Sequence, residues 1–144
     1  VVIWNGSAHV YVKYDGNVDD HEWHHYAFTT TSSSQKLYLD GIEVASGSNT
    51  FANSALANVM TLGSLNNSNY FLNGNLCNVG VWNRVLKKSD VNNIKNMSYE
   101  DFGNTEKNGL VAWWGLEEET GTDGAIGATG GVLDSHGSNH GTLV

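Results

Sequence analysis

The residues best suited to chemistry gather between positions 19 and 25, where the sequence reads DDHEWHH. Histidine and carboxylate side chains serve as general acids, general bases and metal ligands. On an extended strand, neighbouring side chains point to opposite faces, so His24 and His25 cannot bind one metal ion. His21 and His25 share a face but would lie roughly 13 Å apart. We therefore interpret the pair as hydrogen-bonded histidines packed beside a core Trp23, not as a reactive site.

The acidic clusters lack the spacing of a glycosidase. A retaining enzyme holds two carboxyl groups about 5 Å apart, which on a strand requires alternating positions. The clusters at 19–22 and 117–119 are consecutive and lie beside turns, so we interpret both as solvated loops. The sequence also has no nucleophile elbow, phosphate-binding loop or dinucleotide fingerprint. It therefore predicts a protein without catalytic residues.

Charge and length narrow the classes of partner. The 144 residues suit one domain with a real hydrophobic core, and the formal net charge of −8 argues against nucleic acid or an anionic membrane surface. No apolar run approaches the roughly 20 residues that span a bilayer, so we expect no membrane insertion. Cys77 is the single cysteine, and its alternating neighbours predict a buried or half-buried strand residue.

Short β-rich runs between turn signals, with abundant Gly, Asn, Ser and Thr and no proline, predict an all-β sandwich or barrel. We expect strands near Val1–Trp4, His9–Tyr14, Trp23–Thr30, Gln35–Leu39, Ile42–Ser46, Val59–Leu62, Gly74–Trp82 and Leu110–Leu116. The Asp40-Gly41 pair accepts the positive φ angles of a type I′ turn, so the two strands that flank it should form a hairpin.

One short amphipathic helix is expected in LKKSDVNNIKNM, with Ser89 as its cap and Leu86, Val91 and Ile94 on one side. The polar stretch Ser98–Asn108 has no clear period, and we interpret it as a linker.

Three stretches carry a family resemblance: EWHHYAFTTTSSSQKLYLDGIEVASG, LGSLNNSNYFLNGNLCNVGVWNRVLKKSDVNNI, and GLVAWWGLEEETGT with the later LDSHGSNHGTL. Together they resemble laminin G-like and pentraxin-like members of the concanavalin A-like lectin/glucanase superfamily. The resemblance implies a jelly-roll sandwich of two antiparallel sheets with one short helix.

The order of these stretches departs from the family pattern, because the GLVAWW segment normally opens such a domain. We expect residues 1–97 to form the main part of the sandwich and 98–108 a linker. Residues 109–144 would then complete the same sandwich, as in a permuted fold, or start the next repeat of a longer repeat protein. A truncated sandwich leaves sheet edges open, which predicts a homo-oligomer formed by edge-strand pairing or strand exchange.

Calcium is the one cofactor that the sequence suggests. Asp and Asn in loops supply the oxygen ligands that calcium prefers, and the resemblance also implies calcium at the ligand rim. The candidate metal ligands are Asp134, Asp123, Asp19 and Asp20.

Sugar recognition needs an exposed ring beside groups that hydrogen-bond hydroxyls. Trp113 and Trp114 point to opposite faces, so one should be core and the other exposed. The candidate ligand-binding residues are Trp114, Tyr70, Asn139 and His136. We therefore expect a non-enzymatic carbohydrate-binding or adhesion module of a secreted, cell-surface or virion-surface repeat protein. The alternatives are a structural or assembly module without a small ligand and a degenerate glycoside hydrolase.

Overall fold

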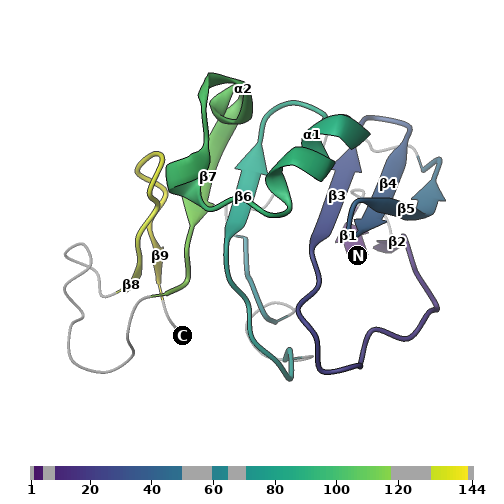
Figure 1. Cartoon of the computed structure of the whole chain (residues 1–144). Helices are drawn as coiled ribbons and strands as arrows, with labels where there is room; N and C mark the ends of the chain where they lie inside the picture. The colour runs from purple at the N-terminus through teal and green to yellow at the C-terminus, as the bar shows by residue number, and fades with distance from the viewer. Residues whose placement is uncertain (1, 5–8, 50–59, 65–70, 118–130, 143–144) are drawn as a thin grey trace. The chain divides into compact units, whose positions relative to one another are not determined.

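The computed structural model describes residues 2–4, 9–49, 60–64, 71–117 and 131–142, which fall into two compact units (Figure 1). The first unit combines Val1–Leu56 with Val85–Met97. The second combines Ala57–Arg84 with Ser98–Val144. No helix in the described residues is long and apolar enough to cross a membrane.

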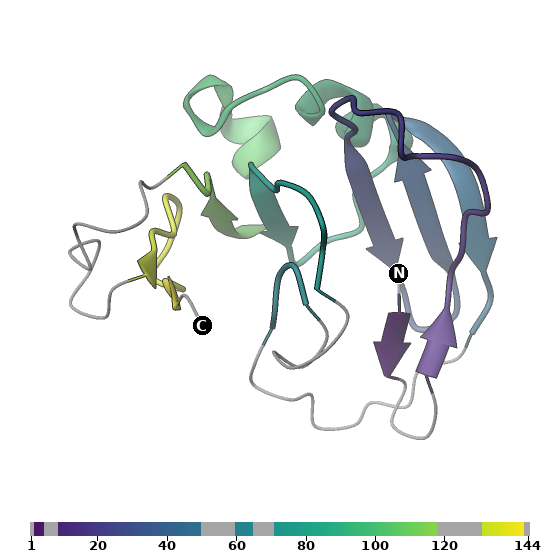
Figure 2. The same cartoon turned by 90° about the horizontal axis from the view of Figure 1, so that it is seen from below.

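The first unit is built on antiparallel strands. Three of them form a sheet in the order β3 (Tyr26–Thr30), β4 (Gln35–Leu39) and β5 (Ile42–Gly47), and β1 (Val2–Trp4) pairs with β2 (His9–Tyr11). The three strands of this sheet lie side by side in Figures 1 and 2. Leu37 lies at its centre, opposite Phe28 on β3 and Ala45 on β5. The prediction of an antiparallel all-β fold is confirmed.

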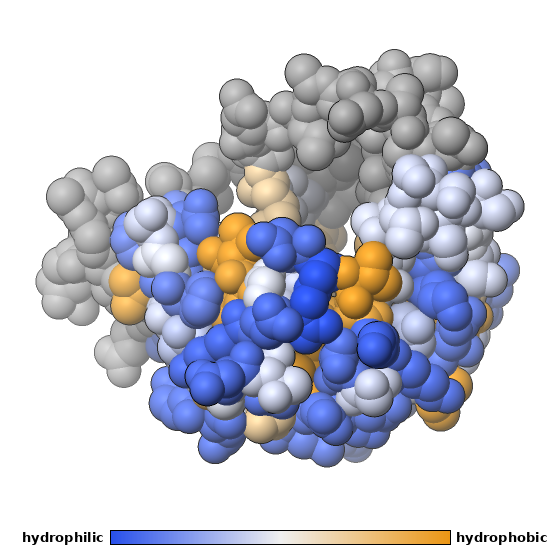
Figure 3. Space-filling model, turned by 90° about the horizontal axis from the view of Figure 1, so that it is seen from above, coloured by the Kyte–Doolittle hydropathy of each residue, from blue (hydrophilic) through white to orange (hydrophobic). Residues whose placement is uncertain are grey.

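The core of the first unit is formed by β4 and the helix α1 (Lys88–Ile94), with Val12 from the segment after β2. Its buried apolar side chains are Val12, Leu37, Tyr38, Leu86, Val91 and Ile94. Gln35 is also fully buried, and its amide is satisfied because it accepts the Asn49 N–H at 2.9 Å and donates to the Asn49 carbonyl at 3.0 Å. On the face seen in Figure 3, the described residues are mostly hydrophilic.

Helix α1 buries Val91 and Ile94, and Leu86, which the sequence places on the same side, is buried just before the helix begins. The cap of the helix differs from the prediction. Ser89 lies inside the first turn, and Lys87 occupies the N-cap position. The Asp90 carboxylate accepts the backbone N–H of Lys87 at 3.0 Å. An acidic side chain at this position therefore satisfies a free N–H of the helix start, and Ser89 is not needed for it.

The second unit pairs β6 (Val79–Trp82) with β7 (Leu110–Trp114) in antiparallel register, and β8 (Gly131–Val132) with β9 (Gly141–Thr142). An isolated bridge joins Trp114 to Asp134. The GLVAWW segment thus forms a strand that pairs with β6 of the same chain, and the sequence did not predict the two short strands β8 and β9.

An aromatic cluster forms the core of the second unit. Phe102 packs edge-on to Trp113 with ring centroids 4.8 Å apart, and its ring lies 6.3 Å from that of Trp82. The Trp82 indole N–H donates to the Glu106 carbonyl at 2.8 Å. The segment Ser98–Asn108 is therefore not a plain linker. It contains the 3₁₀ helix η1 (Tyr99–Asp101) and the helix α2 (Asn104–Lys107), and it is anchored by Phe102, which is buried.

Several predicted strands are shorter in the structure. Those expected at His9–Tyr14, Trp23–Thr30, Gly74–Trp82 and Leu110–Leu116 contract to β2, β3, β6 and β7. Left-handed backbone at Asn78 (φ 54°) and at Leu116 (φ 60°) bounds β6 and β7. Cys77 consequently lies outside β6 and is exposed, contrary to the prediction. Residues 60–62, the described part of another predicted strand, form none.

The hairpin at Asp40-Gly41 is confirmed. Both residues have positive φ angles, 51° and 83°, and the flanking Leu39 and Ile42 pair directly. These angles are those of the predicted type I′ turn. An added Cβ at Gly41 would also overlap the side-chain oxygen of Asn92 in α1.

We expect Gly41→Ala to lower the free energy of unfolding by about 1–2 kcal/mol, because alanine must then adopt left-handed backbone. Urea denaturation measures the loss. Gly115→Ala is the matched control, since an added Cβ there meets nothing within 4 Å and φ is not positive. Adding Asn92→Ala to the Gly41 variant separates the side-chain overlap from the backbone cost. Equal stability of the two glycine variants would contradict the prediction.

Candidate functional site

The carboxylate of Asp40 joins three parts of the first unit. Its Oδ1 accepts the backbone N–H of His25 at 2.9 Å, and its own N–H donates to the His25 carbonyl at 2.8 Å. The Asp40 carbonyl accepts the Lys95 ammonium from the end of α1 at 3.1 Å. Asp40 therefore ties the start of β3 and the helix to the β4–β5 turn.

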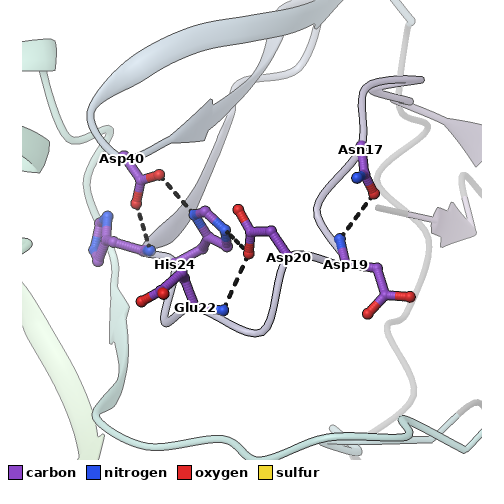
Figure 4. A network of polar contacts seen from close by, with 7 residues as sticks. Asn17, Asp19, Asp20, Glu22, His24 and Asp40 are labelled. Carbon is purple, nitrogen blue, oxygen red and sulfur yellow. Dashed lines mark hydrogen bonds and ion pairs between the residues drawn. The ribbon is translucent and has the colours of Figure 1, made fainter.

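The imidazole of His24 lies between two carboxylates (Figure 4). Its Nδ1 is 2.8 Å from Asp40 Oδ2, and its Nε2 is 3.0 Å from Asp20 Oδ1. Ionised carboxylates only accept hydrogen bonds, so both contacts are hydrogen bonds when the imidazole carries two protons. The hydrogen bond to Asp40, followed by the one to Asp20, raises the pKa of His24 above its ordinary value.

The same contacts keep both carboxylates ionised. The hydrogen bond from His24, followed by the one from the Glu22 N–H, lowers the pKa of Asp20. For Asp40 the backbone N–H of His25 is the largest cause of a lowered pKa, and His24 is the second. We call His24, Asp20 and Asp40 the histidine clamp.

The loop before the clamp is shaped by short polar turns. The Asn17 side chain accepts the Asp19 N–H at 3.0 Å, and Asp20 Oδ1 accepts the Glu22 N–H at 3.1 Å (Figure 4). His21 has a left-handed backbone with φ of 67°. Side-chain oxygens that accept nearby backbone N–H groups stabilise such turns. The stretch 19–22 is thus an ordered loop, and it is bonded to His24 in the segment before β3.

The aromatic residues beside the clamp are exposed. Trp23 is 68% exposed and Tyr26 is 52% exposed, so the prediction that Trp23 is a core residue is wrong. The reason is that β3 begins only at Tyr26, which leaves Trp23 on the loop. The Tyr14 ring lies over Gly16, and Tyr14 is exposed as well.

His25 differs from its neighbour. Its side chain is half-buried, and its Nδ1 has no hydrogen-bond partner in the described part of the chain. Burial lowers the pKa of His25 below its ordinary value, which favours the neutral ring. The two histidine rings therefore lie in different environments, as predicted, although both residues precede β3 and are not on a strand. The hydrogen-bonded ring is that of His24, and it lies beside exposed aromatic residues.

The second unit has a polar centre of its own at Asp134. This residue is only 3% exposed. Its carboxylate accepts the backbone N–H groups of Trp113, His136, Gly137 and Asn139 at 2.9–3.0 Å. Burial alone would raise the pKa of Asp134, but these four N–H groups outweigh it and hold the pKa well below the usual range.

The structure brings four predicted site residues together around this loop, namely Asp134, Trp114, Asn139 and His136. Trp114 is 8% exposed and Trp113 is 4% exposed, so the prediction that one of the two is an exposed ring is wrong. The indole N–H of Trp114 donates to the Asn139 carbonyl at 2.8 Å, which explains its inward position. The side chain of Asn139 donates to Asp134 and to the Val111 carbonyl.

His136 is exposed, and its Nδ1 lies 3.1 Å from the hydroxyl of Tyr99, which sequence reasoning missed. The Lys107 ammonium lies 4.6 Å from the centroid of the Tyr99 ring. Asp19 and Asp20 belong to the other unit. Tyr70 and Asp123 lie outside the described residues.

The predicted metal ligands are used differently in the structure. Asp134 is filled by backbone N–H groups, and Asp20 is bound to His24 and Glu22, so the structure identifies neither as a metal ligand. Among the described residues, no three histidine, cysteine or acidic side chains gather as a metal site would require. Calcium binding stays a prediction from the sequence.

Comparison with known proteins identifies the family of this chain. A laminin G-type family model, described as the concanavalin A-like lectin/glucanases superfamily, matches residues 1–92, which is more than half of the chain. The chain therefore belongs to this family, as the resemblance predicted. The match contains the whole histidine clamp and ends before residues 109–144. The comparisons found no significant match among curated proteins and none among solved structures.

We expect Asp134→Ala to lower the free energy of unfolding by about 3 kcal/mol, because it leaves several buried N–H groups without an acceptor. Asp134→Asn, which retains one oxygen acceptor, should cost less. The pKa of Asp134 is lower in the folded than in the unfolded chain. Its contribution is therefore full at neutral pH and is lost as the pH falls below about 4. Urea denaturation across this pH range measures both effects, and a wild-type stability curve for Asp134→Ala would refute them.

Proposed function

We propose that this chain is a non-enzymatic carbohydrate-binding module of a secreted, cell-surface or virion-surface protein. The observation that carries the proposal is the exposed ring of Trp23, which stands between Glu22 and His24 on the ordered loop beside the clamp. An exposed indole can stack on the apolar face of a sugar, and the neighbouring carboxylates can accept hydrogen bonds from its hydroxyls. Family membership supports a binding or adhesion role.

The backbone that carries Trp23 is fixed on its C-terminal side. The ring of His24 is bonded to Asp20 and Asp40, and the backbone N–H of His25 donates to Asp40. A ring presented on an ordered backbone loses less conformational entropy when a ligand binds. Tyr26, exposed at the start of β3, offers a second aromatic surface close by in the chain.

The clamp itself is poorly suited to catalysis, which supports a non-enzymatic role. While both contacts are made, each ring nitrogen of His24 faces a carboxylate, so neither is placed to take a proton from a substrate. Asp20 and Asp40 have lowered pKa values, so neither carries a proton to donate at neutral pH.

The loop that follows Asp134 is a second candidate position for sugar contacts. His136 and Asn139 are exposed there, as the sequence analysis expected of ligand-binding residues. Its tryptophan is buried, however, so this loop lacks the exposed indole that the first unit has. The Trp23 loop is therefore the position that we favour.

A glycan array tests the proposal. We expect the full chain to bind a reproducible set of glycans and Trp23→Ala to bind them at least about tenfold more weakly, a loss of about 1.4 kcal/mol. Phe71→Ala is the matched control, because Phe71 is 69% exposed and belongs to the other unit.

Equal binding by wild type and Trp23→Ala would refute the Trp23 site. Weaker glycan binding by His136→Ala would in that case indicate that the sugar binds at the second loop. A silent array together with self-association in sedimentation would favour an assembly module. Such a module would use open sheet edges such as β5, where Ile42 is exposed.

A further inference from the structure

We propose that protonation of His24 closes the loop at residues 20–25 and that loss of the proton releases the Asp20 end of this loop, so that presentation of the Trp23 ring depends on pH. The inference rests on the proposed function in one respect, namely that Trp23 is the ring that binds. Its structural part, the opening of the loop, is independent of any ligand.

The argument begins with the protons available at the clamp. Both ring nitrogens of His24 lie within hydrogen-bond distance of a carboxylate oxygen, at 2.8 and 3.0 Å. A doubly protonated imidazole donates to both. A neutral imidazole has one N–H and one lone pair, so one of the two carboxylates would then face a lone pair. Two acceptors at such a distance repel each other, and one contact must open.

The structure indicates which contact opens. Asp40 is held by the turn, by the backbone of His25 and by the strand register, all independently of the His24 ring. Asp20 lies on the loop, where its side chain contacts the His24 ring and the N–H of Glu22. The less constrained partner moves at lower cost, so the neutral ring keeps its proton on Nδ1 toward Asp40 and releases Asp20.

Within the histidine clamp, His24 is the member whose protonation changes, because both of its partners stay ionised. Asp20 and Asp40 stay ionised because hydrogen bonds lower the pKa of each. Burial lowers the pKa of His25, which favours its neutral ring, and Lys95 is bound to the Asp40 carbonyl. Tyr26 has a pKa raised by burial and then by the nearby acids, so it stays protonated.

The direction of the effect follows from His24. Its pKa is higher in the folded than in the unfolded chain, so the clamp contributes fully at pH values below the ordinary histidine pKa. This contribution is lost as the pH rises through the raised pKa of His24. Trp23 should therefore be presented on a fixed loop under mildly acidic conditions and on a loosened loop under alkaline conditions.

Amide hydrogen exchange at about pH 5.5 and about pH 8.5, corrected for the intrinsic rate, tests the loop directly. We expect the Glu22 amide, which donates to Asp20, to lose at least about fivefold of its protection at the higher pH. The His25 amide, which donates to Asp40, should keep its protection and serves as an internal control. Unchanged protection of Glu22 would overturn the inference.

Asp20→Asn is the matched variant. An amide can donate to the unprotonated Nε2 or accept from the protonated one, so the loop of this variant should stay closed at both pH values. His24→Ala should leave the loop open at both. A pH response in Asp20→Asn equal to that of wild type would assign the effect to another group and overturn the inference.

The same glycan array read at both pH values separates the two proposals. Binding that weakens at the higher pH in wild type but not in Asp20→Asn supports the pH-dependent opening of the loop. Binding that requires Trp23 but does not change with pH would overturn this inference and leave the proposed function standing. Loop opening without any effect of Trp23→Ala on binding would overturn the proposed site and leave the structural switch standing.

Discussion

The bond network of the Asp40 carboxylate is the constraint on which the arrangement of the first unit depends. One side chain accepts hydrogen bonds from the backbone N–H of His25 and from the ring of His24, and it belongs to a turn with left-handed backbone. The same residue receives Lys95 from α1 through its carbonyl. Because these contacts converge on a single residue, the turn, the start of β3 and the end of the helix are fixed together.

Local chemistry made the Asp40-Gly41 turn predictable, whereas its partners were not. An Asp-Gly pair between two β-rich runs predicts a type I′ hairpin without knowledge of the rest of the chain. That Asp40 also binds His24 follows from tertiary register, since β3 and β4 pair Tyr26 with Leu39 and so bring residues 25 and 40 together. The two histidines do lie in different environments, but they precede β3, so alternation along a strand is not the reason. The alternation argument placed Trp23 in the core only because it began the strand three residues too early.

The second unit shows why oxygen-rich loops are ambiguous in a sequence. Asp134 was predicted as a metal ligand because a carboxylate in a Gly- and Asn-containing loop can hold a cation. In the structure, the Asp134 carboxylate accepts backbone N–H groups, and no sequence pattern distinguishes a carboxylate that binds N–H groups from one that coordinates a cation. Phe102 gives a second example. It lies between the helices η1 and α2, in a segment that was predicted to be a linker because its sequence has no clear period. Its burial against Trp113 depends on a strand that comes later in the chain.

The two carboxylate centres use the same chemistry with different consequences. The donors to the Asp134 carboxylate are backbone N–H groups, which do not titrate near neutral pH, so these hydrogen bonds persist until the carboxylate itself is protonated. In the histidine clamp one donor is an imidazole, a group whose second proton can be lost by titration. A fold can therefore hold one loop rigid and make another responsive with almost the same set of residues. The loop that we propose to be responsive is the one that carries the exposed indole of Trp23.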